Sequence, residues 1–401
     1  MSTPTAGSVR WLTPNARLAL AAIATGVIYN LDGWLVPGLE QGIVERFHLT
    51  TVATGVIPTA ENVTAGVLSI ALSRWAKWTS LGRPTLLALA LWLLGNIVTP
   101  LAPSAQVLIG LRIMAGIGSG MLVYISSTLA SATLGPDRTY SLLTGASNAF
   151  AAVVIATLPL ILPGAGNLTI FPYAAVVSCA WIPLALLLPA TIQARSISTR
   201  TATDAAGSAG GSTTILAIML VIAVTAFGLY VMSNFSYIIP LAARAGMQQR
   251  DIQLTIGSVA FMGTVGALAV FALPRRMGHG GPILLALLAS CASNYLSTTT
   301  ESSEVLRISM MASQLLAFFM VPLFLGWSAA FDPSGRTATV INGALMVSGS
   351  MSPLVGGYLI QEWSLYALAV QTIAASVIAV ACVVAVWVAL RYRARTVVTT
   401  A

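Results

Sequence analysis

Charged side chains are the scarcest feature of this 401-residue sequence. It has 19 Lys and Arg and 11 Asp and Glu, or 7% of the chain, where a soluble domain carries about a quarter. Hydrophobic residues make up 57%. So few polar groups cannot coat a soluble protein of this length, and so apolar a chain does not stay disordered. The composition excludes soluble enzymes and secreted disulfide scaffolds, and it predicts a polytopic membrane protein.

Cysteine and histidine are also scarce. Cys179, Cys291 and Cys382 lie in apolar runs without metal-ligand spacing, so we expect them to be packing residues. His48 and His279 fall in expected loops, away from any cluster of Cys or carboxylates. No glycine-rich phosphate loop of the Lys-Ser/Thr type occurs. We therefore expect no metal, no cofactor, no ATP-driven step and no enzymatic activity.

Long apolar runs dominate the rest of the sequence. A helix crosses the bilayer core in about 20 apolar residues, and these runs are too continuous for the alternating strands of a barrel. The sequence therefore predicts an all-α membrane protein with twelve transmembrane helices. The expected spans are 17–38, 53–73, 84–101, 104–130, 140–163, 167–189, 213–239, 251–273, 281–299, 304–328, 337–360 and 364–390.

The distribution of Lys and Arg predicts the orientation. With the N-terminus inside, the external loops hold Arg46, Arg244, Arg250 and Arg307, one Arg lies within a span, and the others fall on the cytoplasmic side. This bias predicts both termini in the cytoplasm of a multi-pass protein of the inner (plasma) membrane. It also explains the net charge of +8 without a nucleic-acid partner. The lipid bilayer is the expected partner, with contact to anionic headgroups as a weaker reading.

An internal repeat divides the chain. The stretch 190–212 is rich in Gly, Ser, Thr and Ala, which is typical of a flexible cytoplasmic linker. It separates an expected N-terminal bundle, 1–189, from a C-terminal bundle, 213–401. Residues 81–89 resemble residues 279–287 at an offset of 198, which also places Asn96 on Asn294 and Gly145 on Gly343. An offset of six spans makes the halves a parallel repeat.

These features resemble the major facilitator superfamily, and the compact length resembles its AraJ-like efflux branch. The segment Leu108–Gly120 is similar to the family's Arg-x-x-x-Gly helix, with Arg112 and Gly116 at the motif positions. The family's Gly-x-x-x-Asp-Arg-x-Gly-Arg-Arg loop keeps only Gly82-Arg83, and Thr79 stands at its Asp. The run 348–357 in span eleven is similar to the Gly/Pro run that drug/proton antiporters carry in span five. The resemblance implies two six-helix bundles that rock around a central site.

The small residues of these two segments are expected to form gating or hinge surfaces. Ordinary tight helix packing is the alternative interpretation. The residues are Gly116, Gly118, Gly120, Pro353, Gly356 and Gly357.

Asp32, Glu61 and Arg112 are the charged residues that lie well inside the expected spans, away from their ends. A charge at mid-helix costs about 2.5–3.5 kcal/mol on insertion scales. From the rise per residue of an α-helix, we place all three side chains at similar depths in the outer half of the first bundle. We predict that the two acids carry protons and that Arg112 is their counter-ion. The alternatives are a structural or gating role for Arg112 and a solvated Asp32. The residues at the offset positions are the uncharged Tyr230, Val259 and Met310.

Polar and aromatic side chains within the spans are the expected substrate contacts, because amides and phenols orient a solute while aromatic faces supply area. Each is alternatively a packing or interfacial residue. They are Tyr29, Asn30, Trp34, Tyr124, Asn148, Tyr230, Asn234, Tyr237, Gln314 and Asn342.

The sequence thus predicts a monomeric, proton-coupled secondary transporter that moves a small organic solute by alternating access. The proton gradient is the expected energy source, and the family resemblance favours export. One alternative is a proton symporter that imports an organic anion, with Arg112 as a carboxylate clamp. A second is a non-transporting membrane receptor on the same fold.

Overall fold

The structure is a computed structural model. It describes residues 12–47, 51–76, 80–161, 168–188, 210–273, 277–332 and 334–399. All regular structure in these ranges is helical.

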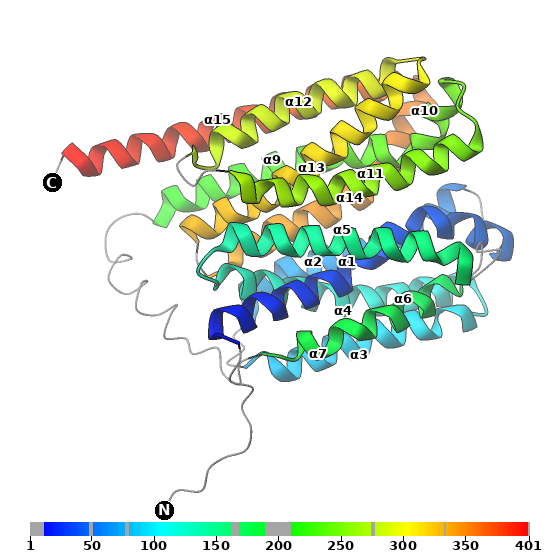
Figure 1. The fold of residues 1–401 in the computed structure, drawn as a ribbon, viewed down its shortest axis with the longest axis horizontal. Coiled ribbons are helices and arrows are strands. Elements are labelled where there is room, and N and C mark those ends of the chain that lie inside the picture. The colour runs from blue at the N-terminus through cyan, green and yellow to red at the C-terminus, as the bar shows by residue number, and fades with distance from the viewer. Residues whose placement is uncertain are drawn as a thin grey trace, which may run out of the picture.

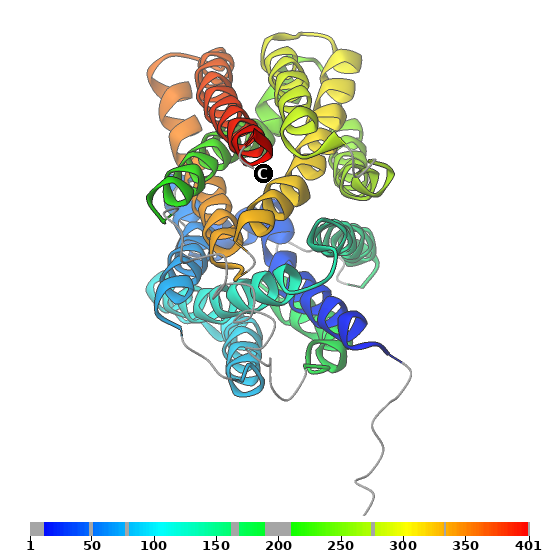
Figure 2. The ribbon, with the colours of Figure 1, turned by 90° about the vertical axis from the view of Figure 1, so that its left-hand side faces the viewer.

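Helices of the first half lie together, as do those of the second half (Figures 1 and 2). The first group is α1 (Pro14–Phe47), α2 (Thr51–Trp75), α3 (Gly82–Val98), η1 (Thr99–Leu101), α4 (Ala105–Ser131), α5 (Pro136–Ile161), α6 (Ile170–Ser178), η2 (Cys179–Trp181) and α7 (Ile182–Ala185). The second is α9 (Gly210–Ser236), α10 (Ile238–Arg244), α11 (Gln249–Ala269), η3 (Val270–Ala272), α12 (Gly280–Thr299), α13 (Ser303–Phe331), α14 (Arg336–Glu362) and α15 (Ala367–Thr399).

Ten helices of the described residues are long and apolar enough to cross a membrane. They correspond to ten of the twelve expected spans. The expected span 17–38 lies within α1, part of whose side chains is outside the described residues, and 167–189 corresponds to a shorter apolar helix, Ile170–Ala185. The count of twelve and the orientation therefore stay predictions.

Two of the expected spans, 167–189 and 17–38, differ markedly from the helices of the structure. The span 167–189 is interrupted by the 3-10 turn η2, because Pro183 lacks an N–H group and its ring crowds the preceding turn. Cys179 lies at this break and is exposed, not packed as expected. Helix α1 runs on to Phe47, so Arg46, expected in a loop, lies in its last turn and donates to the Ala102 carbonyl at 3.2 Å.

The expected linker is only partly described. Helix α9 already begins at Gly210, so the last three residues of the stretch 190–212 are helical. Residues 189–209 lie outside the described residues. The domain boundaries therefore stay a prediction.

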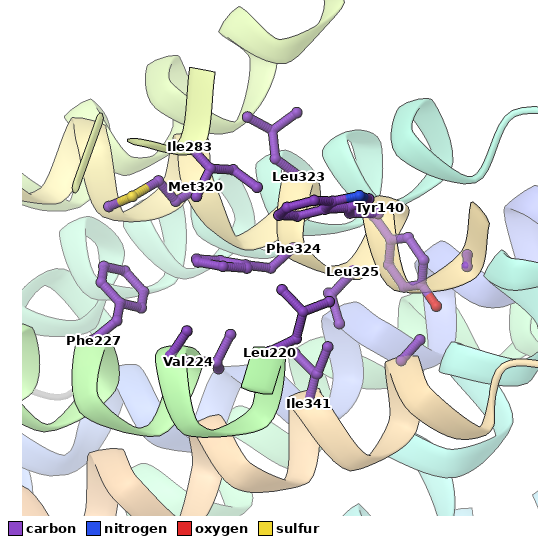
Figure 3. Packing of buried hydrophobic residues seen from close by; sticks show 14 of the residues in the cluster. Tyr140, Leu220, Val224, Phe227, Ile283, Met320, Leu323, Phe324, Leu325 and Ile341 are labelled. Atoms are coloured by element: carbon purple, nitrogen blue, oxygen red, sulfur yellow. The ribbon is translucent and has the colours of Figure 1, made fainter. Parts of the chain in front are cut away.

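The largest hydrophobic cluster contains residues of both halves. Within it α9 packs on α13, where the rings of Phe227 and Phe324 lie 6.1 Å apart (Figure 3). Tyr140 of α5 belongs to the same cluster although it comes from the first half. Its hydroxyl contacts the Ser131 hydroxyl at 2.8 Å and donates to the Ser127 carbonyl at 2.9 Å.

Two helix pairs form the main contacts between the halves, α2 with α14 and α5 with α11. The offset of 198 residues converts one pair into the other. The two contacts are unequal in detail. Gly66 and Gly343 let the backbones of α2 and α14 touch, since a Cβ on Gly66 would lie 2.6 Å from the Gly343 carbonyl oxygen. On the other side, the Ser141 hydroxyl donates to the Ala267 carbonyl at 2.6 Å.

The glycines of α4 are positions of close helix approach. A Cβ on Gly118 would lie 2.6 Å from the Trp92 backbone nitrogen and 2.7 Å from the Ala88 carbonyl oxygen of α3. Gly116 and Gly120 meet backbone oxygens of α2 in the same way. These residues hold α2, α3 and α4 together, which matches the packing interpretation, and a hinge role stays a prediction.

The small residues of α14 surround one aromatic side chain. The Tyr237 ring packs on Gly356, where a Cβ would lie 2.8 Å from its Cε2 atom, and its hydroxyl lies over Gly357. The same hydroxyl donates to the Pro353 carbonyl at 2.6 Å. This segment therefore holds the end of α9, and its predicted role in gating is untested.

Gly118→Ala should lower the stability of the purified protein by about 1–3 kcal/mol, because the new methyl group must displace backbone atoms. Gly110→Ala is the matched control, since this glycine lies on the same helix and has no neighbouring atom within 4 Å of an added Cβ. Thermal unfolding in detergent measures both. Equal midpoints for the two variants would contradict the close-packing account.

Candidate functional site

Three ionisable side chains from three helices meet inside the first half. Arg112 of α4 is fully buried, and Asp32 of α1 and Glu61 of α2 are each 5% exposed. Arg112 Nη1 lies 3.2 Å from Glu61 Oε2. The structure thus brings together the three residues predicted to couple protons.

The Arg112 guanidinium is also bound by the end of α3. Nη1 donates to Asn96 Oδ1 at 3.1 Å. Nη2 donates to the Gly95 carbonyl at 2.8 Å and to the Thr99 hydroxyl at 2.5 Å. The ring of Phe171 covers one face, with its centroid 3.9 Å from Cζ. Among the described residues, an acceptor is missing only for Nε, so the cation is almost completely coordinated by the protein.

Asp32 is held by two donors from α3. Its Oδ2 accepts from Trp92 Nε1 at 2.7 Å and from Asn96 Nδ2 at 3.3 Å. No N–H or hydroxyl group of the described residues donates to Oδ1. The site therefore holds one guanidinium and two carboxyl groups, of which Glu61 pairs directly with Arg112.

Asn96 links the cation to the acid pair, because it accepts from Arg112 and donates to Asp32. From the sequence, Asn96 is predicted only as a marker of the repeat, and Trp92 and Phe171 are not among the predicted site residues. Their positions do carry one signal. Asn96 follows Trp92 by four residues, so both lie on one face of α3, and an amide within an apolar span needs a partner.

Uncharged groups join the equivalent helices, α9 and α12, in the second half. The offset of 198 places Asp32 on Tyr230 and Trp92 on Ser290, and the Tyr230 hydroxyl donates to Ser290 Oγ at 3.2 Å. One turn further along α9, Asn234 Nδ2 donates to Asn294 Oδ1 at 2.9 Å. Tyr230 and Asn234 were expected to contact substrate, but both are buried and bonded within their own half.

Other expected substrate contacts do lie between the halves. Tyr29 Oη of α1 accepts from Asn342 Nδ2 of α14 at 2.9 Å. Trp34 stacks on Phe318 of α13, with centroids 5.6 Å apart and planes 28° apart, and meets Phe235 of α9 edge-on at 6.1 Å. The contacts bring α1 against three helices of the second half.

The remaining predicted substrate contacts do not point to one common site. Asn148 of α5 is buried beside Gly263 of α11, and its Nδ2 has no hydrogen-bond acceptor in the part of the chain that the structure describes. Asn30 donates to the Gly26 carbonyl of its own helix at 3.0 Å. Gln314 is buried in α13, and Tyr124 packs against the large hydrophobic cluster. With Tyr237 bonded to α14, the structure does not gather all ten candidates at one place.

No protein-family model matches the chain, and no curated protein sequence matches it. Among solved structures, it is similar to the human organic anion transporter MFSD10 (TETRAN), with a TM-score of 0.71 and 14% identity over 93% of this chain and 100% of that chain. It is also similar to a bacterial homologue of the iron transporter ferroportin in its outward-facing state with soaked iron, with a TM-score of 0.69 and 16% identity over 94% and 99% of the two chains.

At these identities the likeness establishes the fold. The expected major facilitator fold is confirmed, and the proteins that share it here are membrane transporters, not enzymes. Neither similarity bears on the AraJ-like branch. The roles of the site residues stay predictions.

Arg112→Met should destabilise the protein by about 3–5 kcal/mol, because it leaves the carboxyl groups and their neighbours without their buried partner. The chain supplies a matched control in the exposed Arg307–Glu304 pair of α13, where Arg307→Met should cost about 0–1 kcal/mol. Thermal unfolding in detergent compares the two. If Arg112→Met unfolds at the midpoint of Arg307→Met, the cluster does not hold the first half together.

Proposed function

We propose that this protein is a secondary transporter that couples the movement of a small organic solute to that of protons by alternating access. The observation that carries the proposal is the buried site of Asp32, Glu61 and Arg112, in which Glu61 pairs with the guanidinium and Asp32 is linked to it through Asn96. The transporters that share the fold support the general class.

The charges of this site suit a proton carrier. The three groups carry a net charge of −1 with both acids ionised, 0 with one acid protonated and +1 with both protonated, so a single proton changes the electrostatic state of the whole buried cluster. Arg112 keeps its place during such a change because Asn96, Gly95 and Thr99 hold it independently of the acids. Asp32 and Glu61 are the proposed carriers, and Arg112 is the proposed counter-ion.

The contacts between the halves fit alternating access. Near the start of α2, the Thr59 hydroxyl donates to the Ser350 carbonyl at 3.2 Å. The bond from Ser141 to Ala267 lies near the start of α5, at the opposite end of the bundle. The halves are therefore joined at both ends by contacts that rigid-body rocking would break one end at a time.

The coordination of Arg112 weighs against a role as a carboxylate clamp. Both of its terminal nitrogens are already occupied, and the side chain is fully buried. An anionic substrate would have to displace Glu61 or bind elsewhere. An organic anion is still the second candidate substrate, because the similar MFSD10 is an organic anion transporter. Export is proposed on the family resemblance alone, and no observation favours the receptor alternative.

Glu61→Gln and Asp32→Asn should each reduce solute accumulation driven by a pH gradient at least about tenfold, which corresponds to 1.4 kcal/mol of coupling. A thermal-shift screen of organic anions, cations and neutral solutes at pH 5.5 and 8.5 first supplies a ligand. Proteoliposome flux under imposed pH gradients of either sign then measures accumulation. Exchange of labelled for unlabelled solute without a gradient should continue in both variants, because only coupling is lost.

Glu304→Gln is the control, since this acid is exposed on α13 and should leave accumulation unchanged. If the double variant of Asp32 and Glu61 still concentrates solute against its gradient, the proton-carrier assignment is wrong. Uptake driven by external acid would overturn the proposed export and favour symport.

A further inference from the structure

A second acid–base pair joins the two halves, far from the buried acids along the chain. Asp137 lies in the first turn of α5 and His279 directly precedes α12. His279 Nε2 lies 2.9 Å from Asp137 Oδ1. The side chains are 21% exposed for His279 and 43% exposed for Asp137, so protons from the solvent reach this pair.

Residues of the second half form a recess that holds the Asp137 side chain. Its carboxyl group lies directly over Gly326 of α13, in the space that a Cβ atom would fill. The next residue, Trp327, stacks on the His279 ring with centroids 6.2 Å apart and planes 7° apart. The aspartate therefore enters a recess formed by a glycine and a histidine whose ring orientation is fixed.

Neighbouring contacts extend this docking along α5. The Arg138 guanidinium lies over the Phe271 ring, 6.0 Å from its centroid. The Ser141 hydroxyl reaches the Ala267 carbonyl one turn further on. Residues 137–141 thus rest on the junction between α11 and α12, at the end of the bundle that the charge bias assigns to the cytoplasm.

The repeat-related position carries no such pair. The offset of 198 places Asp137 on Gly335 and His279 on Leu81. Gly335 adopts a positive φ of 77° and packs on Ser127 and Thr128 of α4. The fold therefore does not require a charged contact here, and the Asp137–His279 pair is a separate addition to one of two equivalent positions.

We propose that Asp137 and His279 form a pH-dependent lock that holds the two halves together at this end. Histidine ordinarily changes charge between pH 5 and 8, and a charge-assisted hydrogen bond is stronger than a neutral one. In acid, the imidazolium ion pairs with the carboxylate and the lock is closed. In base, the ring is neutral, the ion pair is lost, and the halves separate more readily at this end.

Other charged groups at this end of the bundle contact residues other than His279. Arg138 of α5 faces Phe271. Asp332, between α13 and α14, accepts from the backbone and hydroxyl of Thr337 at 2.7 and 2.8 Å. Arg391 of α15 lies over the Trp387 ring at 4.3 Å. The carboxylate within ion-pair distance of His279 among the described residues is Asp137.

The lock is independent of the proposed coupling site, so its test needs neither a substrate nor a proton gradient. Leu134, at the turn between α4 and α5, is 90% exposed, and Met277, before α12, is 57% exposed. Spin labels at these positions, in a background without the three native cysteines, report the separation of the halves. Double electron–electron resonance gives the fraction of molecules with a long distance at pH 5.5 and 8.5.

With native Asp137 and His279, the long-distance fraction should rise about two- to fivefold from pH 5.5 to 8.5, the range for a partly exposed ion pair. His279→Gln should remove the pH response, while His48→Gln, at the only other histidine, should preserve it. Gly326→Ala should raise the fraction at both pH values, because the methyl group fills the recess. Asp137→Asn should lose most of the response and covers the case in which Gly326→Ala does not fold.

A pH response that persists in His279→Gln would overturn the lock. So would a native-like long-distance fraction and pH response in both Gly326→Ala and Asp137→Asn. Glu61→Gln separates the two proposals, because it should leave the response intact. If Glu61→Gln abolishes the response and His279→Gln does not, the pH sensitivity belongs to the buried acids.

Discussion

A guanidinium within the hydrocarbon core must be coordinated by the protein, because lipid offers it no partner. Arg112 meets this requirement with contacts from α2, α3 and α6, and through Asn96 it reaches Asp32 of α1. The glycines that bring α2 and α3 close to α4 follow from the same requirement. Gly95, for example, admits Ala115 at a distance that a side chain would block, and its carbonyl then binds the cation. Much of the first half is arranged around this one residue.

In the second half, neutral groups join the two helices that correspond to α1 and α3. The Tyr230–Ser290 and Asn234–Asn294 hydrogen bonds link α9 to α12, as Asp32 links α1 to α3. Neutral hydrogen bonds do not change when a proton arrives, so the internal contacts of the second half stay the same and it can move as a rigid body. A change of charge in the first half then acts on one side of the interface only. Such asymmetry suits a mechanism in which two rigid bundles move relative to each other.

Much of this arrangement was predictable from composition and helical rise. The long apolar runs predicted the helices, and the depths of Asp32, Glu61 and Arg112 along their helices predicted that the three would meet. The prediction worked because charges within a bilayer have few alternatives to one another. Pro183 was visible in the sequence and could have predicted the break that shortens the expected span 167–189.

What the sequence did not reveal depends on how each helix is rotated about its axis. Trp92 and Phe171 complete the site from faces of α3 and α6 that apolar periodicity does not distinguish. The same uncertainty made Tyr230 and Asn234 candidate substrate contacts, although both face the interior of their own half. Asp137 and His279 are distant in the sequence, and only the packing of α5 on α13 and on the segment before α12 makes them neighbours.

The crossing of Gly66 and Gly343 brings the two halves into backbone contact at one edge of their interface. A Cβ on Gly66 would lie 2.6 Å from the Gly343 carbonyl oxygen, and a Cβ on Gly343 would lie 2.8 Å from the Gly66 carbonyl oxygen. Any added methyl group at either position would wedge the two bundles apart. The minimum spacing of the bundles along this edge is therefore fixed by two residues that have no side chain to adjust.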